Sequence, residues 1–431
     1  MGISDRERIA HVVRRLSMGT HPDVVAALDG TDAAVARALD RSGAAAPPLE
    51  MSVPTEVRSP GRVREVLTAI DWWITRMQSA DRMVDERLTW FWHDHFATSV
   101  TKVKVPYLVY QQHLTLRQHA TGNFAELLKA MAKDPAMLLY LDGITNSAKQ
   151  RNENFGRECL ELFTMGRDAG YTQDDVVAAS RAFTGWVVAV PGRPLLARLG
   201  APWSAVFLPR RHDIGTKTFL GATGTFDMDA ALDVILEQPA TSRYVAAKLH
   251  RELVGLDPDA STLASLASSF RRDYEILPLV TEIAQHDAFR SDAAVRAKYR
   301  SPVEKLVGIL QAAASPGAGG PGAGGPPTAP RPRGSVAAVR ALRAMGYVPF
   351  LPPNVAGFPK GARLLVPGNL VHTFDLLQAV DTAPRNLSVD DLFARFGVHD
   401  VSDSTRTVVG RERDAGRRFA LAATSPEYSL T

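Results

Sequence analysis

Cysteine is almost absent from this chain, since Cys159 is the only one in 431 residues. A single thiol excludes an internal disulfide framework, a cysteine-rich zinc module and dithiol redox chemistry. Long uncharged apolar runs are also missing, and none approaches the ~20 residues that a membrane-spanning helix needs. The N-terminal segment Met-Gly-Ile-Ser-Asp-Arg-Glu-Arg carries charges where a secretory signal has its apolar stretch. We therefore expect a cytoplasmic protein without a membrane span.

Neither positive nor negative charge is in large excess. Fifty Lys and Arg residues face 46 Asp and Glu residues, so the formal net charge is only +4. The chain has no basic stripe interleaved with aromatic residues, and we expect no nucleic-acid partner. Walker loops, Gly-x-Ser-x-Gly elbows, His-Glu-x-x-His motifs and dinucleotide glycine fingerprints are missing too. Their absence weighs against the commonest kinase, hydrolase and dehydrogenase mechanisms.

What the chain does have is the pattern of a large helical protein. Hydrophobic residues make up 45% of it, enough for a sizeable core. Apolar residues at helical spacing predict helices over most of residues 1–310. Four small polar residues are predicted N-caps that mark helix starts. Three have a carboxylate three residues later: Asn123 with Glu126, Thr172 with Asp175, and Ser301 with Glu304. The fourth, Asp134, directly precedes Pro135. Gly166 and Gly185 are predicted helix ends.

Two segments depart from the helical pattern. Residues 186–227 carry short β-branched runs separated by Pro and Gly, which predicts a small inserted β-hairpin or sheet. Residues 315–334 are dominated by Gly, Pro and Ala, which predicts a flexible linker or insertion. We therefore expect a mainly α fold, with a main helical domain over 1–310 and a C-terminal helical segment over 335–431 packed on it.

The first candidate for chemistry is the segment 90–96, Trp-Phe-Trp-His-Asp-His-Phe. On a helix, His95 would face the core and His93 would point about 160° away from it. Both histidines can meet one metal ion only if the helix ends here, and the following Thr98 and Ser99 favour such an end. The alternative is a helix end whose buried histidines bind backbone carbonyls.

The second candidate lies on the predicted helix over residues 151–163. Phe155, Cys159, Leu162 and Phe163 form its expected core face, and Glu158 and Glu161 lie beside that face. Two carboxylates one turn apart can bind one cation or share a proton. The alternative is a solvated helix face on which Glu153 and Arg157 form an ion pair.

The third candidate combines Arg181 with residues 212–217, His-Asp-Ile-Gly-Thr-Lys, in the predicted β region. Arg181 and Lys217 suit an anionic substrate. His212 beside Asp213 suits a general base with an orienting carboxylate, or a further metal ligand. The alternative is a hairpin held by salt bridges.

Taken together, these motifs resemble those of the bacterial domain-of-unknown-function 1800 family. The matching segments are 90–96, 134–142, 152–158, 161–166, 181–186, 212–217, the Ser-Pro-Val-Glu-Lys segment that ends at Lys305, and 352–359. The resemblance covers nearly the whole chain and implies a mostly helical bacterial protein without an established reaction. It also implies a possible sulfatase-like partner protein, since relatives are often exported and often have such a neighbour. Phe358 stands where relatives tend to have Trp.

Two functional hypotheses follow. In the first, His93, His95, Glu158 and Glu161, with Asp142 or His212 completing the shell, bind zinc, manganese or iron, and the metal supports hydrolysis or oxidation. In the second, the protein is a non-catalytic binding or scaffold protein, and the same polar groups form a buried structural network. The concentration of imidazole and carboxylate groups favours the enzyme.

Overall fold

The structure is a computed structural model that describes residues 2–45, 47–57, 61–314, 335–380 and 383–431. Helices dominate it, which confirms the predicted mainly α fold. The predicted linker over 315–334 lies outside the described residues. No helix in the described ranges has the length and apolar character that crossing a membrane requires.

The elements follow one another along the chain in three groups. The first group is helical: α1 (Asp5–Leu16), α2 (Pro22–Ala26), α3 (Thr31–Leu39), α4 (Arg62–Met77), α5 (Met83–His95), α6 (Val100–Val103), α7 (Pro106–His119), α8 (Phe124–Ala132), α9 (Pro135–Tyr140) and η1 (Gly143–Thr145). The second group holds the strands: α10 (Asn154–Glu158), η2 (Cys159–Thr164), α11 (Gln173–Ala182), β1 (Trp186–Val188), α12 (Pro194–Ala197), β2 (Ala205–Phe207), η3 (Pro209–Arg211), β3 (Lys217–Phe219) and β4 (Ala222–Gly224). The third is helical again: α13 (Met228–Glu237), α14 (Pro239–Val254), α15 (Ala260–Arg271), α16 (Ile276–Gln285), α17 (Asp287–Arg290), α18 (Pro302–Ala313), α19 (Ser335–Ala344), η4 (Gly361–Leu364), α20 (Pro367–Leu376), η5 (Leu377–Ala379), α21 (Val389–Arg395), α22 (Asp403–Arg411), α23 (Ala415–Ala423) and α24 (Pro426–Ser429).

The predicted helix starts are confirmed. The side chains of Asn123 and Asp134 accept hydrogen bonds from the first-turn amides of α8 and α9. Thr172 with Asp175, and Ser301 with Glu304, form complete capping boxes at α11 and α18. Each cap satisfies amides that a helix start leaves without an intrahelical partner.

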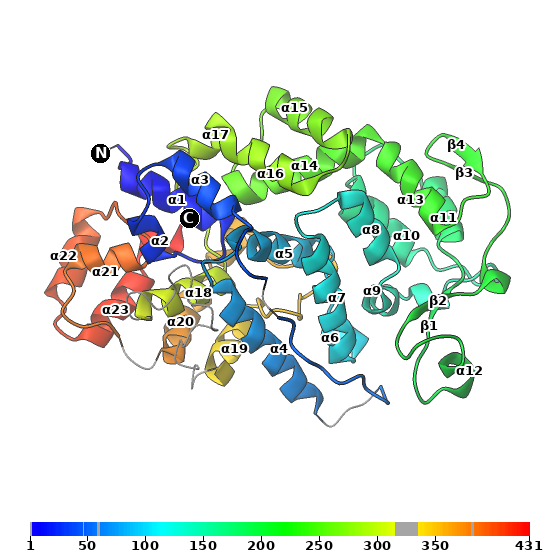
Figure 1. Cartoon of the computed structure of the whole chain (residues 1–431), viewed down its shortest axis with the longest axis horizontal. Coiled ribbons are helices and arrows are strands. Elements are labelled where there is room, and N and C mark those ends of the chain that lie inside the picture. The colour runs from blue at the N-terminus through cyan, green and yellow to red at the C-terminus, as the bar shows by residue number, and fades with distance from the viewer. Residues whose placement is uncertain (1, 46, 58–60, 315–334, 381–382) are drawn as a thin grey trace.

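The inserted β structure is also confirmed. Strands β1 and β2 pair antiparallel, with Val187 opposite Val206. Strands β3 and β4 form a second antiparallel pair, with Thr218 opposite Thr223. In Figure 1 both pairs lie at one end of the molecule, β3 and β4 next to α11, and β1 and β2 nearer α9 and α12.

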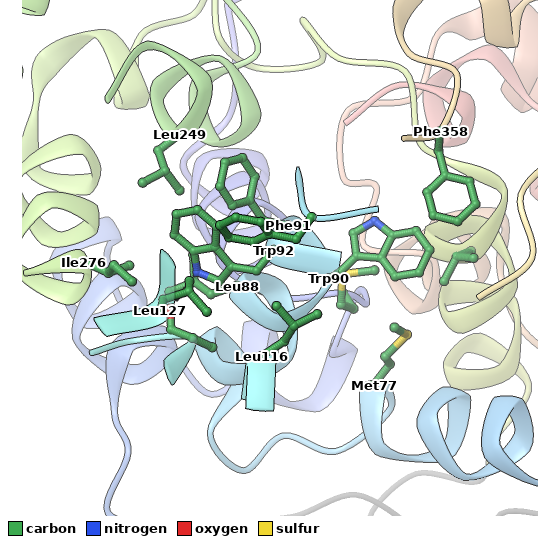
Figure 2. Packing of buried hydrophobic residues seen from close by; sticks show 14 of the residues in the cluster. Met77, Leu88, Trp90, Phe91, Trp92, Leu116, Leu127, Leu249, Ile276 and Phe358 are labelled. Carbon is green, nitrogen blue, oxygen red and sulfur yellow. Dashed lines mark hydrogen bonds between the residues drawn. The ribbon is translucent and has the colours of Figure 1, made fainter. Parts of the chain in front are cut away.

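Helix α5 runs through the middle of the molecule, and almost all of its side chains are buried. Figure 2 shows that Trp90 points to one side of this helix, toward Phe358 and Met77. Phe91 and Trp92 point to the other side, where Leu127 and Leu249 lie. Because α5 contributes to the core on both sides, the groups at its C-terminal end are fixed by packing from every direction.

The C-terminal segment packs on the helices that precede it. The rings of Tyr347 and Phe358 stack at 4.7 Å between centroids, and Trp90 stacks on Phe358 at 5.3 Å. Farther along, the backbone amide of His399 donates to the Glu7 carboxylate of α1 at 2.7 Å. The contacts of Phe358 with Trp90 and of His399 with Glu7 join residues hundreds of positions apart. Buried residues from both parts of the chain belong to one apolar core.

Candidate functional site

Helix α5 ends at His95, as a shared metal site would require, but the two histidine rings have separate partners. His93 Nε2 accepts a hydrogen bond from the backbone amide of Phe350 at 3.1 Å. His95 Nε2 donates to the carbonyl oxygen of Phe163 at 2.9 Å. Burial lowers the pKa of His93 to about 4 and holds the pKa of His95 well below its usual value. Both rings are therefore neutral near pH 7.

The helix over 151–163 differs from its prediction. It is α-helical only to Glu158, and residues Cys159–Thr164 form a π-helix. The wider turn buries Leu160 completely, whereas Leu162, a predicted core residue, is only partly buried. Such π segments are rare and often accompany functional sites.

The acidic candidates on and near this helix are partly paired with cations. Glu161 lies 3.3 Å from Arg167, and Asp142 lies 2.8 Å from Lys102 in an exposed pair. Glu158 is half-buried, and burial together with the neighbouring Glu161 raises its pKa. Glu158 and Glu161 are thus close enough to repel each other.

The described residues contain no group of three or more His, Cys, Asp and Glu side chains that could hold one metal ion. His93 and His95 each bind a backbone group, and Asp142 binds a lysine. Within the residues that the structure describes, the side chains predicted to bind zinc, manganese or iron therefore do not form one such group. The roles of His93, His95, Glu158, Glu161 and Asp142 as ligands remain predictions.

The third candidate cluster has the geometry of a salt-bridged hairpin. Arg181 donates two hydrogen bonds to Asp213, at 2.7 and 3.0 Å, and the resulting contact lowers the pKa of Asp213. Lys217 is buried and donates to the carbonyl oxygens of Asp213 and Gly215. His212 Nδ1 lies 3.1 Å from both oxygens of Thr184, and within the described residues no hydrogen bond joins it to Asp213. The catalytic roles of these four residues remain predictions.

A different place in the fold forms a pocket, with a volume of about 360 Å³. Trp90, Phe91 and Asp94 of α5 form one wall, and Lys248, Arg251 and Glu252 of α14 form another. Residues 297–304 and 347–364 complete it. Three segments on which the family resemblance rests meet or border here: 90–96, the Ser-Pro-Val-Glu-Lys segment at 301–305, and 352–359 just before Lys360. We call this cavity the Lys248 pocket.

The wall formed by Asp94 is held by the C-terminal segment. Asp94 Oδ1 accepts the backbone amide of Phe358 at 2.7 Å, and Asp94 Oδ2 lies 2.5 Å from Lys360 Nζ. Burial opposes the charge on Lys360, yet Asp94 raises the pKa of Lys360 above its usual value. The ion pair thus fixes one cation at the rim of the pocket, where the Lys360 side chain is 51% exposed.

A buried network of ions includes three residues of the pocket lining, Glu252, Lys298 and Glu304. Arg87 binds Glu304 at 2.6 Å and Glu252 at 3.2 Å, and Lys298 also binds Glu252. Although burial opposes ionisation of Glu304, Lys298 and Arg87 hold its pKa below the usual value. Each of these charges therefore has an opposite charge in contact with it.

Lys248 stands apart from this network. Its Nζ makes no hydrogen bond or ion pair with any side chain that the structure describes, and it lies 5.3 Å from the centroid of the Tyr244 ring. Burial and the nearby Lys360 cation lower the pKa of Lys248 to about 7, against the opposing effects of Asp94 and Glu252. The pocket therefore contains an amine that is about half neutral near pH 7.

Tyr347 offers a second group to the same pocket. Its ring is buried in the aromatic stack with Trp90 and Phe358, and burial together with Asp94 raises its pKa well above the usual value. The phenol accordingly keeps its proton and can only donate or accept hydrogen bonds.

Most residues of this pocket carry no signal in the sequence. Lys248 sits on α14 among apolar residues, and no spacing marks it as different from a surface lysine. Asp94 lies inside the segment 90–96, where its two histidine neighbours are the stronger candidates for metal binding. Lys360 directly follows the segment 352–359, and this position is the only signal that the sequence offers for it.

The fold and the pocket define a mainly α-helical protein with a charged, aromatic-lined cavity beside its central helix. The profile of the family described as protein of unknown function (DUF1800) matches residues 11–430. The chain belongs to this family. No curated protein and no solved structure matches the chain.

Proposed function

We propose that the protein binds a small organic anion in the Lys248 pocket. The observation that carries this proposal is the ammonium of Lys248, which has no carboxylate partner among the described residues. The other cations of the lining are paired: Lys298 with Glu252, Lys360 with Asp94, and Arg251 with Asp257. Cations are rarely buried without a partner, so a bound anion would complete the site.

The size and the walls of the pocket agree with such a ligand. A volume of about 360 Å³ lies at the lower end of the range for small-molecule sites. The aromatic wall of Trp90 and Tyr347 supplies apolar area for a short carbon skeleton. The Tyr347 hydroxyl supplies a hydrogen-bond donor for an anionic oxygen.

The test is calorimetric titration of the full chain with acetate, lactate, pyruvate and phosphate at pH 7.5. Because a bound anion raises the pKa of Lys248, binding should take up protons, and two buffers with different ionisation enthalpies measure that uptake. Lys248→Met should abolish binding and proton uptake. Lys149→Met, which changes an exposed lysine outside the pocket, should leave both unchanged. Equal binding by wild type and Lys248→Met, or no binding of any of the four anions, would contradict the proposal.

The alternative of a non-catalytic scaffold is favoured by one specific observation. His93 and Asp94 both accept backbone amides of the C-terminal segment, at 3.1 and 2.7 Å. This supports a structural role for the polar groups of segment 90–96, in which they hold residues 347–360 against α5. Under this alternative the Lys248 pocket would bind none of the anions above.

The proposal of a metal-dependent hydrolase or oxidase can be tested separately. Plasma mass spectrometry of protein purified without chelator should give the same metal content for wild type, His95→Ala and Glu158→Ala. Near-stoichiometric metal that is lost in both variants would restore the metal hypothesis. The sulfatase-like partner and the cytoplasmic location remain predictions that this experiment does not address.

A further inference from the structure

We infer that Lys248 is an amine nucleophile that forms an imine with a carbonyl group of the pocket's ligand, so that the ligand class is a small oxo acid. This inference rests on the proposed function, because it assigns chemistry to the same pocket. It goes further in naming a covalent step and the group on the ligand that takes part.

The Lys248 side chain is in the state that imine formation requires. Lysine reacts with carbonyl groups only as the free amine, and enzymes obtain that amine by desolvation or by a second cation nearby. Lys248 has both: it is half-buried on α14, and Lys360 is the neighbouring cation that lowers its pKa. Asp94 and Glu252 act in the opposite direction, but each is already neutralised by its own ion pair.

The groups around the amine suit the carbonyl and the carboxylate of an oxo acid. Tyr347 keeps its proton and lines the same cavity, so it can donate a hydrogen bond to a carbonyl oxygen as negative charge develops there. Lys360 and Arg251 are both more than half exposed at the rim, with side-chain exposures of 51% and 55%. Both stay in their ion pairs, and their positive charges at the rim attract the carboxylate of an oxo acid while its carbonyl carbon faces Lys248.

The step balances without any oxidant or reductant. The lone pair of the Lys248 nitrogen forms the N–C bond while the electrons of the carbonyl π bond move to oxygen. Both protons of the amine end on that oxygen, the C–O bond breaks, and one water molecule leaves as the C=N bond forms. The products are the imine and water.

The experiment is reductive trapping of the full chain with pyruvate and sodium cyanoborohydride at pH 7, followed by intact-mass measurement and peptide mapping. An ordinary surface lysine has roughly a thousandfold smaller fraction of free amine at this pH. We therefore expect one adduct, located at Lys248, and excess lactate should suppress it by competing for the pocket. Adducts spread over exposed lysines with no preference for Lys248 would overturn the inference.

Two variants separate this inference from the proposed function. Lys248→Arg keeps a cation but cannot form an imine, so it should bind lactate and give no adduct. Lys149→Met should give the wild-type adduct. Lactate binding without a pyruvate adduct in wild type overturns the imine and leaves the anion-binding proposal standing. Failure of both measurements overturns both, and the mapping in wild type does not depend on any variant's stability.

Discussion

A Cβ atom on Gly357 would lie 2.2 Å from Asp94 Oδ1 and 2.6 Å from the Asp94 carbonyl oxygen. Gly357 also has a φ of +88°, in the left-handed region. The next residue, Phe358, donates its amide to the same Oδ1. Only glycine therefore lets residues 352–359 close against the C-terminal end of α5 and bring Lys360 to the pocket.

Gly357→Ala should destabilise the protein by about 3 kcal/mol, because the strained φ and the collision with Asp94 add together. Urea denaturation followed by circular dichroism measures this. Gly361→Ala is the matched control, since Gly361 has a φ of +61° but nothing within 4 Å of its Cβ position. The control should lose only about 1 kcal/mol. Equal losses in the two variants would show that the contact with Asp94 has no energetic weight.

Arg87→Met should cost about 3–5 kcal/mol, because it leaves Glu252 and Glu304 without one of their cations in a buried network. Chemical denaturation at pH 7.5 gives the value. The comparison variant is Arg157→Met, which removes partly exposed i,i+4 pairs with Glu153 and Glu161 and should change stability by at most about 0.5 kcal/mol. A loss below about 1 kcal/mol for Arg87→Met would mean that water reaches and solvates the two carboxylates.

Asp134 makes the stability of the protein fall as pH rises, which is opposite to the usual effect of a carboxylate whose pKa is lowered by folding. Burial raises its pKa to about 7, so the folded state binds more protons than the unfolded state between pH 4 and 7. Wild-type stability should therefore fall through this contribution as pH rises across that window. Asp134→Asn keeps an oxygen for the amide of Met137 and cannot ionise. The variant should gain stability relative to wild type at pH 8 and show a smaller gain at pH 4.5, by urea midpoints.

Asp259 is the control, because folding lowers its pKa and its effect on stability therefore changes with pH in the opposite direction. It caps α15, and the hydrogen bond from the Ser261 hydroxyl, with others from Thr262, lowers its pKa. Its contribution is present above its unfolded pKa and is lost as pH falls. Asp259→Asn should accordingly be less stable than wild type near neutral pH, with a difference that shrinks in acid. Parallel pH dependences for the two variants would contradict the assigned direction for Asp134.

Arg181→Lys tests the cluster at the β insertion. A lysine cannot reproduce the two parallel hydrogen bonds to Asp213, so we expect a loss of about 1 kcal/mol. Thermal unfolding measures the loss, and calorimetry should show unchanged anion binding in the Lys248 pocket. Loss of anion binding at unchanged stability would instead support the catalytic role predicted for Arg181.

The helical class, the capped helix starts and the position of the β insertion follow from the sequence alone. These features depend on residues within a few positions of one another. For example, the Thr172 side chain accepts the backbone amide of Asp175, and the Asp175 side chain accepts the backbone amide of Thr172. Neither hydrogen bond needs a residue from elsewhere in the chain. The end of α5 at His95 was also predictable, because the residues that stop the helix follow it directly.

Only the tertiary structure decided which polar groups face one another. His93 and His95 lie two positions apart, yet each ring binds a backbone group from a different distant segment, Phe350 and Phe163. The π-helix at Cys159–Thr164 changes which side chains are buried, and no local signal predicts it. Lys248, Asp94, Tyr347 and Lys360 come from separate elements, and their charge states depend on burial and on one another. Because burial and pairing are properties of the packed molecule, the pocket could not be found from spacing along the chain.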